Sequence, residues 1–316
     1  MIAVLSVVLF LGKMAAWYFT QSVAILTDAL ESIVNVVAGF IGLYSVMLAA
    51  KPRDRNHPFG HGKVEYISAA IEGSLIFIAG IVIVYEAVLR LFNPEPVKSL
   101  DMGMALILIT GIINYIAGTY AVRKGITHRS ATVEAAGKHI RSDAYSTFGI
   151  FIGLILLKLT HWLWIDSIVA LLFAAIILVT GYRVVRKSLS GIMDEADETV
   201  VNEVIQFLQH HRRPQWIDMH NLRVLQYGDV LHIDAHMTMP WYYTVKDSEQ
   251  EIHDVEQLIQ EHFGSQVEIF IHIDACAYYS CKLCAMENCP VREQDFQQLV
   301  IWNAENVWKN IKHGED

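Results

Sequence analysis

The sequence predicts a membrane protein of two unlike parts: an all-α six-helix transmembrane domain, and a smaller α+β domain with a Cys-rich C-terminal tail. Three observations lead to this prediction. Of the 316 residues, 53% are hydrophobic and only 18% are charged, whereas soluble domains have about 25% charged residues. Residues 1–193 hold 16 Lys and Arg against 11 Asp and Glu, while residues 194–316 hold 8 against 22. The four cysteines all fall within residues 276–289.

The first part contains six stretches long enough to cross a bilayer. A spanning helix needs about 20 mostly apolar residues. The first stretch lacks the basic start and the cleavage site of a signal peptide, so we interpret it as a spanning helix too. The six predicted segments are residues 2–20, 23–49, 66–92, 102–122, 136–157 and 163–185.

Basic residues mark alternate loops, which predicts the orientation of the chain. They gather after the second, fourth and sixth segments, whereas the loops after the third and fifth carry only Lys98 and Lys158. Loops rich in Lys and Arg stay in the cytoplasm. We therefore expect a multi-pass protein of the cell (inner) membrane, with both termini cytoplasmic and the acidic domain in the cytosol. A charge of −14 on that domain and the low overall charge exclude a nucleic-acid binder with a basic face.

Two pairs of polar residues lie inside the predicted membrane segments. Glu31 and Asn35 are four residues apart in the second segment, and His139 and Asp143 repeat that spacing in the fifth. Residues at this spacing share a helix face, and ionisable groups at membrane depth are usually functional. Facing each other, the pairs offer four ligands for a divalent cation, with Asp28 as a possible fifth. The alternative is that they only hydrogen-bond between helices.

The loop after the second segment contains a further candidate site. Asp54, His57 and His61 follow one another at spacings of three and four, within reach of one cation near the membrane surface. The two histidines flank a Pro58-Phe-Gly60 stretch that permits a tight turn. The alternative is a loop whose histidines contact only solvent or lipid headgroups.

The acidic part has the periodicity of a small α+β domain. Helical spacing over residues 198–211 and 246–263 alternates with strand-like runs at 217–226, 230–239 and 267–273, and Tyr227-Gly228-Asp229 is the expected hairpin turn. The order αββαβ predicts a helix-backed three-stranded sheet of the ferredoxin-like, metallochaperone-like type. Strand alternation puts Ile233 on one face of the sheet and His236 on the other.

The tail carries Cys276, Cys281, Cys284 and Cys289. A reducing cytosol disfavours disulfides, and four clustered thiolates can hold Zn²⁺ or an iron–sulfur cluster. Neither usual motif spacing is met, so we rank zinc first, an iron–sulfur cluster second and free thiols third. Residues 291–311 are expected to form an amphipathic helix.

Several motifs together resemble the cation diffusion facilitator family over about residues 1–275. They are the Ser22–Ser32 segment, the Asp54–Glu65 loop, His139-Ile-Arg-Ser-Asp143, and Ile192-Met-Asp194-Glu195 at the membrane exit. The resemblance implies a homodimeric divalent-metal/proton antiporter with six transmembrane helices and a cytosolic ferredoxin-like domain.

The resemblance also implies which residues bind the transported metal. The family takes two ligands from each of helices 2 and 5, here Glu31, Asn35, His139 and Asp143. Zinc-type members usually carry His or Asp at the first position and Asp at the second, so Glu31 and Asn35 depart from that pattern. Zinc remains the first candidate, and the oxygen-rich set leaves Fe, Mn, Co or Ni open.

Two further features follow from the resemblance. The family's cytosolic metal cluster corresponds to His220, His236, Glu249, His272 and Asp274, with Glu249 where zinc-binding relatives carry His. Lys63 is expected to pair with Asp194 in an interdomain salt bridge.

The sequence thus predicts three parts: a cation-efflux domain (1–193), a dimerisation domain (194–275), and a cysteine cluster with a helix (276–316). The leading hypothesis is a secondary transporter that exports a divalent transition metal by proton antiport, with protons, divalent cations, lipid and a second copy of the chain as partners. The alternative is a membrane-anchored metal sensor or redox protein acting through the tail. An enzyme is not expected, because the sequence contains no nucleophile–base motif and no phosphate- or dinucleotide-binding motif.

Overall fold

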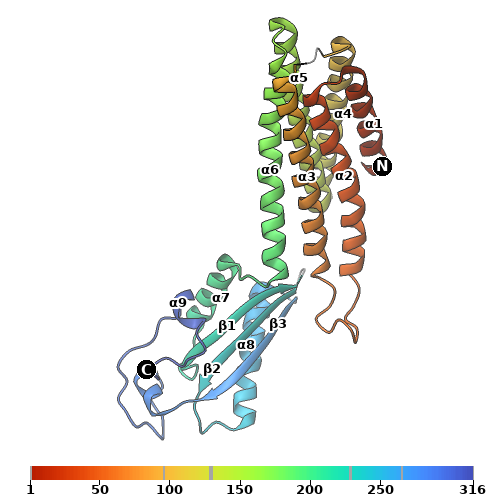
Figure 1. Cartoon of the computed structure of the whole chain (residues 1–316). Helices are drawn as coiled ribbons and strands as arrows, with labels where there is room; N and C mark the ends of the chain where they lie inside the picture. The colour runs from red at the N-terminus through yellow and green to blue at the C-terminus, as the bar shows by residue number, and fades with distance from the viewer. Residues whose placement is uncertain (1, 95–96, 128–130, 228–229, 265, 316) are drawn as a thin grey trace. The chain divides into compact units, whose positions relative to one another are not determined.

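The computed structural model describes residues 2–94, 97–127, 131–227, 230–264 and 266–315 (Figure 1). The chain divides into two compact units, one of Met1–Met47 with Val64–Leu189 and the other of Leu48–Lys63 with Ser190–Asp316. This division differs from the three predicted parts, since the loop before Val64 and the cysteine tail both group with the second unit.

The first unit is a bundle of long helices, and each of the six predicted segments corresponds to one of them. By length and composition, α2 to α6 can cross a membrane, whereas α1 contributes a shorter apolar stretch, Val7–Thr20. The described helices of this unit are α1 (Ile2–Thr20), α2 (Val23–Ala49), α3 (Val64–Phe92), α4 (Leu100–Thr127), α5 (Ala131–Thr160) and α6 (Trp164–Ile192).

Small residues let the helices of the bundle approach closely. A Cβ on Gly118 of α4 would lie 2.8 Å from the backbone nitrogen of Arg141 and 2.9 Å from the carbonyl oxygen of Gly137, both in α5. A Cβ on Gly181 of α6 would likewise lie 2.8 Å from the nitrogen of Phe77 in α3. Close backbone approach is the usual means of helix association in lipid, where burial of apolar surface gives no advantage.

A carboxylate from α6 holds the start of α2. Asp166 is buried, and it accepts hydrogen bonds from the hydroxyl of Ser22 and, at 2.8 Å, from the backbone nitrogen of Val23. The first N–H groups of a helix have no partner within the helix and carry partial positive charge. Asp166 therefore caps α2 from another helix and ties the two helices together.

The second unit contains a mixed three-stranded sheet in the predicted αββαβ order. β2 is central: it pairs antiparallel with β1 and parallel with β3. The parallel pair needs a long crossover, which α8 supplies. Thr244 and Asp247 form a reciprocal capping box at the start of α8. The elements are α7 (Glu198–His210), β1 (Asp218–Tyr227), β2 (Val230–Met239), α8 (Val245–Phe263) and β3 (Val267–Ala275).

The sheet has one apolar face and one polar face, as the alternation predicts. Ile233 and Met237 are buried in a core that also contains Leu208 of α7 and Ile259 of α8. His236 lies on the opposite face. Residues 228 and 229 of the predicted hairpin turn lie outside the described residues.

The prediction of an amphipathic helix over residues 291–311 is wrong. After a short 3-10 helix (Tyr278–Leu283), the tail is irregular, and in this stretch its one described α-helical turn is α9 (Ala304–Val307). The backbone nitrogens of Gln297 and Gln298 donate to the carbonyl of Lys282, so they are committed to contacts that a continuous helix would break. Trp302 and Val307 are buried in the sheet domain's core instead.

The close approach of α4 and α5 gives a testable stability prediction. Gly118→Ala should lower the melting temperature of the purified protein in detergent, because a Cβ there meets backbone atoms and overpacking costs about 1–3 kcal/mol. The matched control is Gly42→Ala, since a Cβ on Gly42 meets no atom within 4 Å. A Gly118→Ala protein as stable as the Gly42→Ala protein, measured by scanning fluorimetry, would contradict this account of the packing.

Candidate metal sites

The polar residues of α2 and α5 meet at a cavity inside the helical bundle. The cavity has a volume of about 100 Å³, and Glu31 and Asn35 of α2 and His139 of α5 line it. Residues of α3 and α6 complete the walls, and all of them are apolar, such as Ile76 and Ile177, except Thr180. The cavity therefore offers a carboxylate, an amide and an imidazole in largely apolar surroundings.

Asp143 completes this group through hydrogen bonding. The amide nitrogen of Asn35 donates to Oδ2 of Asp143 at 2.9 Å, and Nε2 of His139 lies 3.9 Å from the same oxygen. The i, i+4 spacing thus brings both pairs together across α2 and α5. Among the described residues, the ligand atoms of Glu31, His139 and Asp143 do not all lie within 4.8 Å of one another.

Asp28 lies apart from the cavity and has partners of its own. Its Oδ1 accepts hydrogen bonds from Nζ of Lys13 in α1 at 2.8 Å and from the hydroxyl of Thr147 in α5 at 2.9 Å. Lys13 and Asp28 are each only 1% exposed, while the second oxygen of Asp28 is buried with no hydrogen-bond partner. Sequence reasoning missed Lys13, although a lone cation in the apolar segment 2–20 was a signal.

The loop before α3 gathers its three predicted ligands. Oδ1 of Asp54 lies 3.2 Å from Nδ1 of His57, and Oδ2 lies 3.6 Å from Nε2 of His61. The backbone nitrogens of Asn56 and His57 donate to the Asp54 carboxylate, and this bonding lowers its pKa. Gly60 adopts a φ of 88°, which closes the turn between the histidines. Two imidazoles and a carboxylate suit a zinc-like cation.

Contacts with the sheet domain hold this loop in place. Arg53 pairs with Glu268 of β3, and the ring of Phe59 lies 5.9 Å from that of His232 in β2. Nζ of Lys63 lies 2.8 Å from Oδ2 of Asp194, the pair that the resemblance implies. The loop ligands are therefore fastened at several points within the second unit.

Strand register assembles a second cluster on the polar face of the sheet. His220 pairs with His236 across β1 and β2, and His236 pairs with His272 across β2 and β3. Oδ2 of Asp274 lies 3.3 Å from Nε2 of His220 and 3.0 Å from Nδ1 of His236. Three ligand atoms from His220, His236 and Asp274 fall within 4.8 Å of one another. Two imidazoles and a carboxylate again suit zinc.

The other two predicted members of the cluster are placed differently. The ring of His272 lies 4.6 Å from that of His236, next to the cluster. Glu249 lines a separate surface groove on α8 with His253 and Glu256. The participation of Glu249 therefore stays a prediction.

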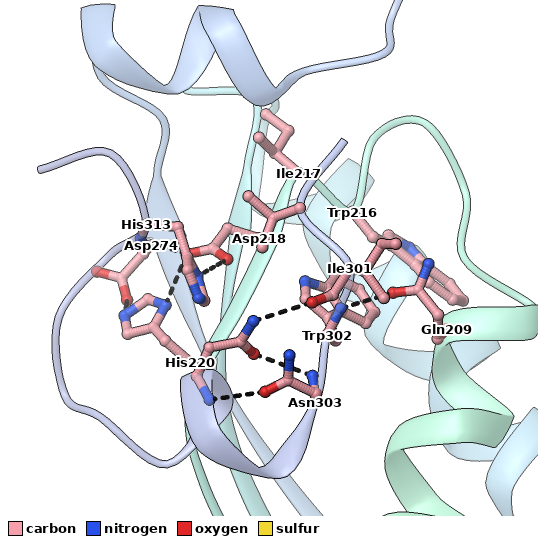
Figure 2. Close-up of polar contacts among 12 residues, drawn as sticks. Gln209, Trp216, Ile217, Asp218, His220, Asp274, Ile301, Trp302, Asn303 and His313 are labelled. Atoms are coloured by element: carbon pink, nitrogen blue, oxygen red, sulfur yellow. Dashed lines mark hydrogen bonds and ion pairs between the residues drawn. The ribbon is translucent and has the colours of Figure 1, made fainter. Parts of the chain in front are cut away.

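The end of the tail contacts this cluster, which sequence reasoning did not foresee (Figure 2). Nζ of Lys312 lies 3.2 Å from Oδ1 of Asp274, and His313 bonds the buried carboxylate of Asp218, which also lies 3.3 Å from Nδ1 of His220. Burial alone would raise the pKa of Asp218, but hydrogen bonds from His220 and His313 outweigh burial and hold it well below its usual range. The Asp218 carboxylate thus links the tail to the cluster.

The four tail cysteines are all unpaired thiols and line one small cavity. Among the described residues, the compact groups of His, Cys, Asp and Glu ligand atoms are the loop and sheet clusters, without the thiols.

Comparison with known proteins accounts for both units. Residues 1–193 match the family described as the cation efflux transmembrane domain, and residues 196–276 match the cation efflux protein cytoplasmic domain. The chain therefore carries both the transmembrane and the cytoplasmic domain of the cation efflux proteins. Cys276 is the last residue of the second match, and Cys281, Cys284 and Cys289 lie beyond it.

Curated relatives agree over most of the chain. An uncharacterised transporter of Synechocystis sp. is 32% identical, over 81% of this chain and 83% of its own length. The cadmium, cobalt and zinc/H⁺–K⁺ antiporter of Bacillus subtilis is 25% identical, over 84% and 86%. The manganese efflux system protein MneP of the same species is 25% identical, over 85% and 92%. With both domains matched, the chain belongs to the cation diffusion facilitator family, whose members are membrane transporters of metal cations and not enzymes.

Proposed function

We propose that this transporter exports a divalent transition-metal cation from the cytoplasm in exchange for protons, with the cation bound between α2 and α5. The observation that carries the proposal is the cavity of about 100 Å³ lined by Glu31, Asn35 and His139. Ionisable groups in a bundle interior are costly and generally mark an ion pathway. Asp143 adds a second carboxylate next to the cavity.

The donor set determines which cations suit the site. One imidazole nitrogen and oxygens from two carboxylates and an amide form a mixed set, suited to borderline and harder divalent ions. We place zinc first, with Fe, Mn, Co and Ni as the alternatives that Asn35 leaves open. The two relatives from Bacillus subtilis, named for cadmium, cobalt and zinc and for manganese, span this range.

His139 is the proposed proton carrier. A neutral imidazole binds metal and a protonated one releases it, so metal and proton compete for the same nitrogen. Glu31 and Asp143 would compensate the charge of either cation. Rocking of helices about the cavity would expose it to each side of the membrane in turn.

We assign Asp28 a structural role in the bundle and not a role as a metal ligand. Its carboxylate is already paired with Lys13 and Thr147, and breaking a buried ion pair leaves an uncompensated charge that costs about 3–5 kcal/mol. This pair supplies a rigid neighbour for the cavity.

The remaining parts are assigned roles in assembly and regulation. We propose a homodimer in the inner membrane with both termini cytoplasmic. Metal at the loop cluster and at the sheet cluster would bias the transporter's conformational equilibrium when cytoplasmic metal rises. The Lys63–Asp194 pair would act at the hinge. Family membership favours transport over the alternative of a tail-based sensor or redox protein.

The first test removes the carboxylate beside the cavity. Asp143→Ala should reduce metal-dependent proton flux in proteoliposomes by about 100-fold or more, because a ligand and a compensating charge are lost together. Asp101→Ala is the matched control, since Asp101 pairs with Lys158 on an exposed surface. Undiminished flux in the Asp143→Ala protein, with its elution volume unchanged on gel filtration, would refute the assignment.

Selectivity gives the second test. Asn35→Asp adds a negative charge and a strong oxygen ligand facing Asp143, and it restores the residue usual in zinc-type members. The ratio of zinc to manganese transport, measured with both radiolabelled ions in one vesicle preparation, should rise several-fold. Asn35→Ala serves as the comparison and should slow both ions without raising the ratio. An unchanged ratio in Asn35→Asp would mean that this position does not set selectivity.

The sheet cluster gives the third test. Lys312→Gln should tighten zinc binding at this cluster about 5-fold, because it removes the lysine ammonium that competes with zinc for Asp274. A partly exposed ion pair of this kind contributes about 1 kcal/mol, which corresponds to that change in affinity. His236→Ala should weaken zinc binding at least 10-fold. Titration calorimetry in a background of Asp143→Ala, His57→Ala, Cys281→Ser and Cys284→Ser isolates the site. Lys309→Gln controls for net charge, and equal affinity in both lysine variants would show that Lys312 does not compete.

A further inference from the structure

The four cysteines of the tail line one cavity, and three of these cysteines lie beyond both matched domains. All four thiols, from Cys276, Cys281, Cys284 and Cys289, line it, and its remaining walls come chiefly from apolar side chains such as Ile217, Pro240 and Met286. No carboxylate is among these lining residues. The convergence of four thiols in one cavity, from a segment of 14 residues, is the starting observation.

Polar N–H and O–H groups act on three of the four sulfurs. The backbone nitrogen of Trp241 lies 3.4 Å from Sγ of Cys276 and donates to it. Burial raises the pKa of the Cys284 thiol, and the backbone N–H of Met286 acts against that rise. Burial and the neighbouring Cys289 raise the pKa of the Tyr242 hydroxyl. Burial raises the pKa of the Cys276 thiol, and the Trp241 N–H acts against that rise. Such donors favour the thiolate and orient metal ligands from outside the first coordination sphere.

Two guanidinium groups supply positive charge beside the cavity. Arg292 donates to the carbonyl oxygens of Cys281 and Cys284, each at 3.1 Å, and it lines the cavity. Arg212 interacts electrostatically with Asp218 and, more weakly, with Cys284. Four thiolates around one Zn²⁺ carry a net charge of −2, which Arg292 and, in smaller part, Arg212 would offset.

We propose that the four tail thiols bind one Zn²⁺ ion as a tetrathiolate structural centre. The cavity volume is about 10 Å³, room for about one water-sized body, so it suits a single ion and not a multi-atom cluster. Zinc–sulfur bonds of about 2.3 Å put the sulfurs of a tetrahedral site about 3.8 Å apart. No three of these sulfurs lie within 4.8 Å of one another in the described structure. Binding therefore turns the thiols inward and releases their protons.

This centre would hold the tail against the sheet. The backbone nitrogen of Cys276 bonds the carbonyl of Met239 at the end of β2, next to the sheet cluster. Beyond the cavity, Trp302 enters the core and Lys312 reaches Asp274. His313 reaches Asp218 (Figure 2). Zinc would thus fix the starting point of a segment whose end contacts the sheet cluster.

The test measures zinc in the full-length protein purified from zinc-supplemented cells. The background carries Asp143→Ala, His57→Ala and His236→Ala, so that the other candidate sites do not contribute. We expect one zinc per chain by elemental analysis. Cys281→Ser with Cys284→Ser should abolish it, whereas Cys289→His, which keeps a ligand, should retain it. Cobalt loaded in place of zinc should show the charge-transfer bands of tetrahedral thiolate ligation.

A second measurement needs no substitution in the tail. Titration of the thiols with a mercurial should release the zinc in step with the loss of four thiols per chain. Three results would each overturn the proposal. The first is a zinc content that Cys281→Ser with Cys284→Ser leaves unchanged. The others are iron with acid-labile sulfide in the protein, or two disulfides detected by mass spectrometry. Because the readout is bound metal, the result does not depend on whether the chain transports zinc.

Discussion

The bundle depends on satisfying the polar groups of α2, because charged and polar side chains in a membrane interior are stable only with partners. Three neighbouring helices supply those partners. Lys13 of α1 pairs with Asp28, Asp143 of α5 accepts from Asn35, and Asp166 of α6 caps the first turn. Each bond both satisfies α2 and fixes another helix against it. The cavity lined by Glu31 is therefore held by the same contacts that hold the bundle.

The sheet domain separates its apolar and polar functions between the two faces of one sheet. Because side chains alternate along a strand, Ile233 enters the core while His236 faces outward. The antiparallel and parallel pairings then bring histidines of all three strands to one level. A candidate metal cluster thus follows from strand register without any loop of its own. The tail adds polar partners to this cluster, because Lys312 bonds the carboxylate of Asp274 and His313 bonds that of Asp218.

Three ligand groups arise from three different local geometries. Helical spacing presents the residues of α2 and α5, a tight turn gathers Asp54, His57 and His61, and strand pairing aligns His220 with His236. The loop group is also bonded to the sheet domain, through Arg53 and Lys63. Metal at the loop group or at the sheet group would therefore act on elements of the second unit that already contact one another, which is the physical basis for coupling binding to a conformational equilibrium.

Local periodicity in the sequence by itself determined the six helices, the αββαβ order and the helix faces that carry Glu31, Asn35, His139 and Asp143. These features depend on residues a few positions apart, where backbone geometry is regular. Only the tertiary structure decided that Lys13 neutralises Asp28, that Asp166 caps α2, and that the tail follows an irregular path to Asp274. The contact of Lys13 with Asp28 joins residues 15 positions apart, and that of Asp166 with α2 joins residues 143 positions apart. In the tail, Lys312 bonds a residue 37 positions away. Local sequence patterns do not encode contacts over such separations. The expected helix over 291–311 failed for the same reason: long-range bonds to Lys282 and burial of Trp302 outweighed its local spacing.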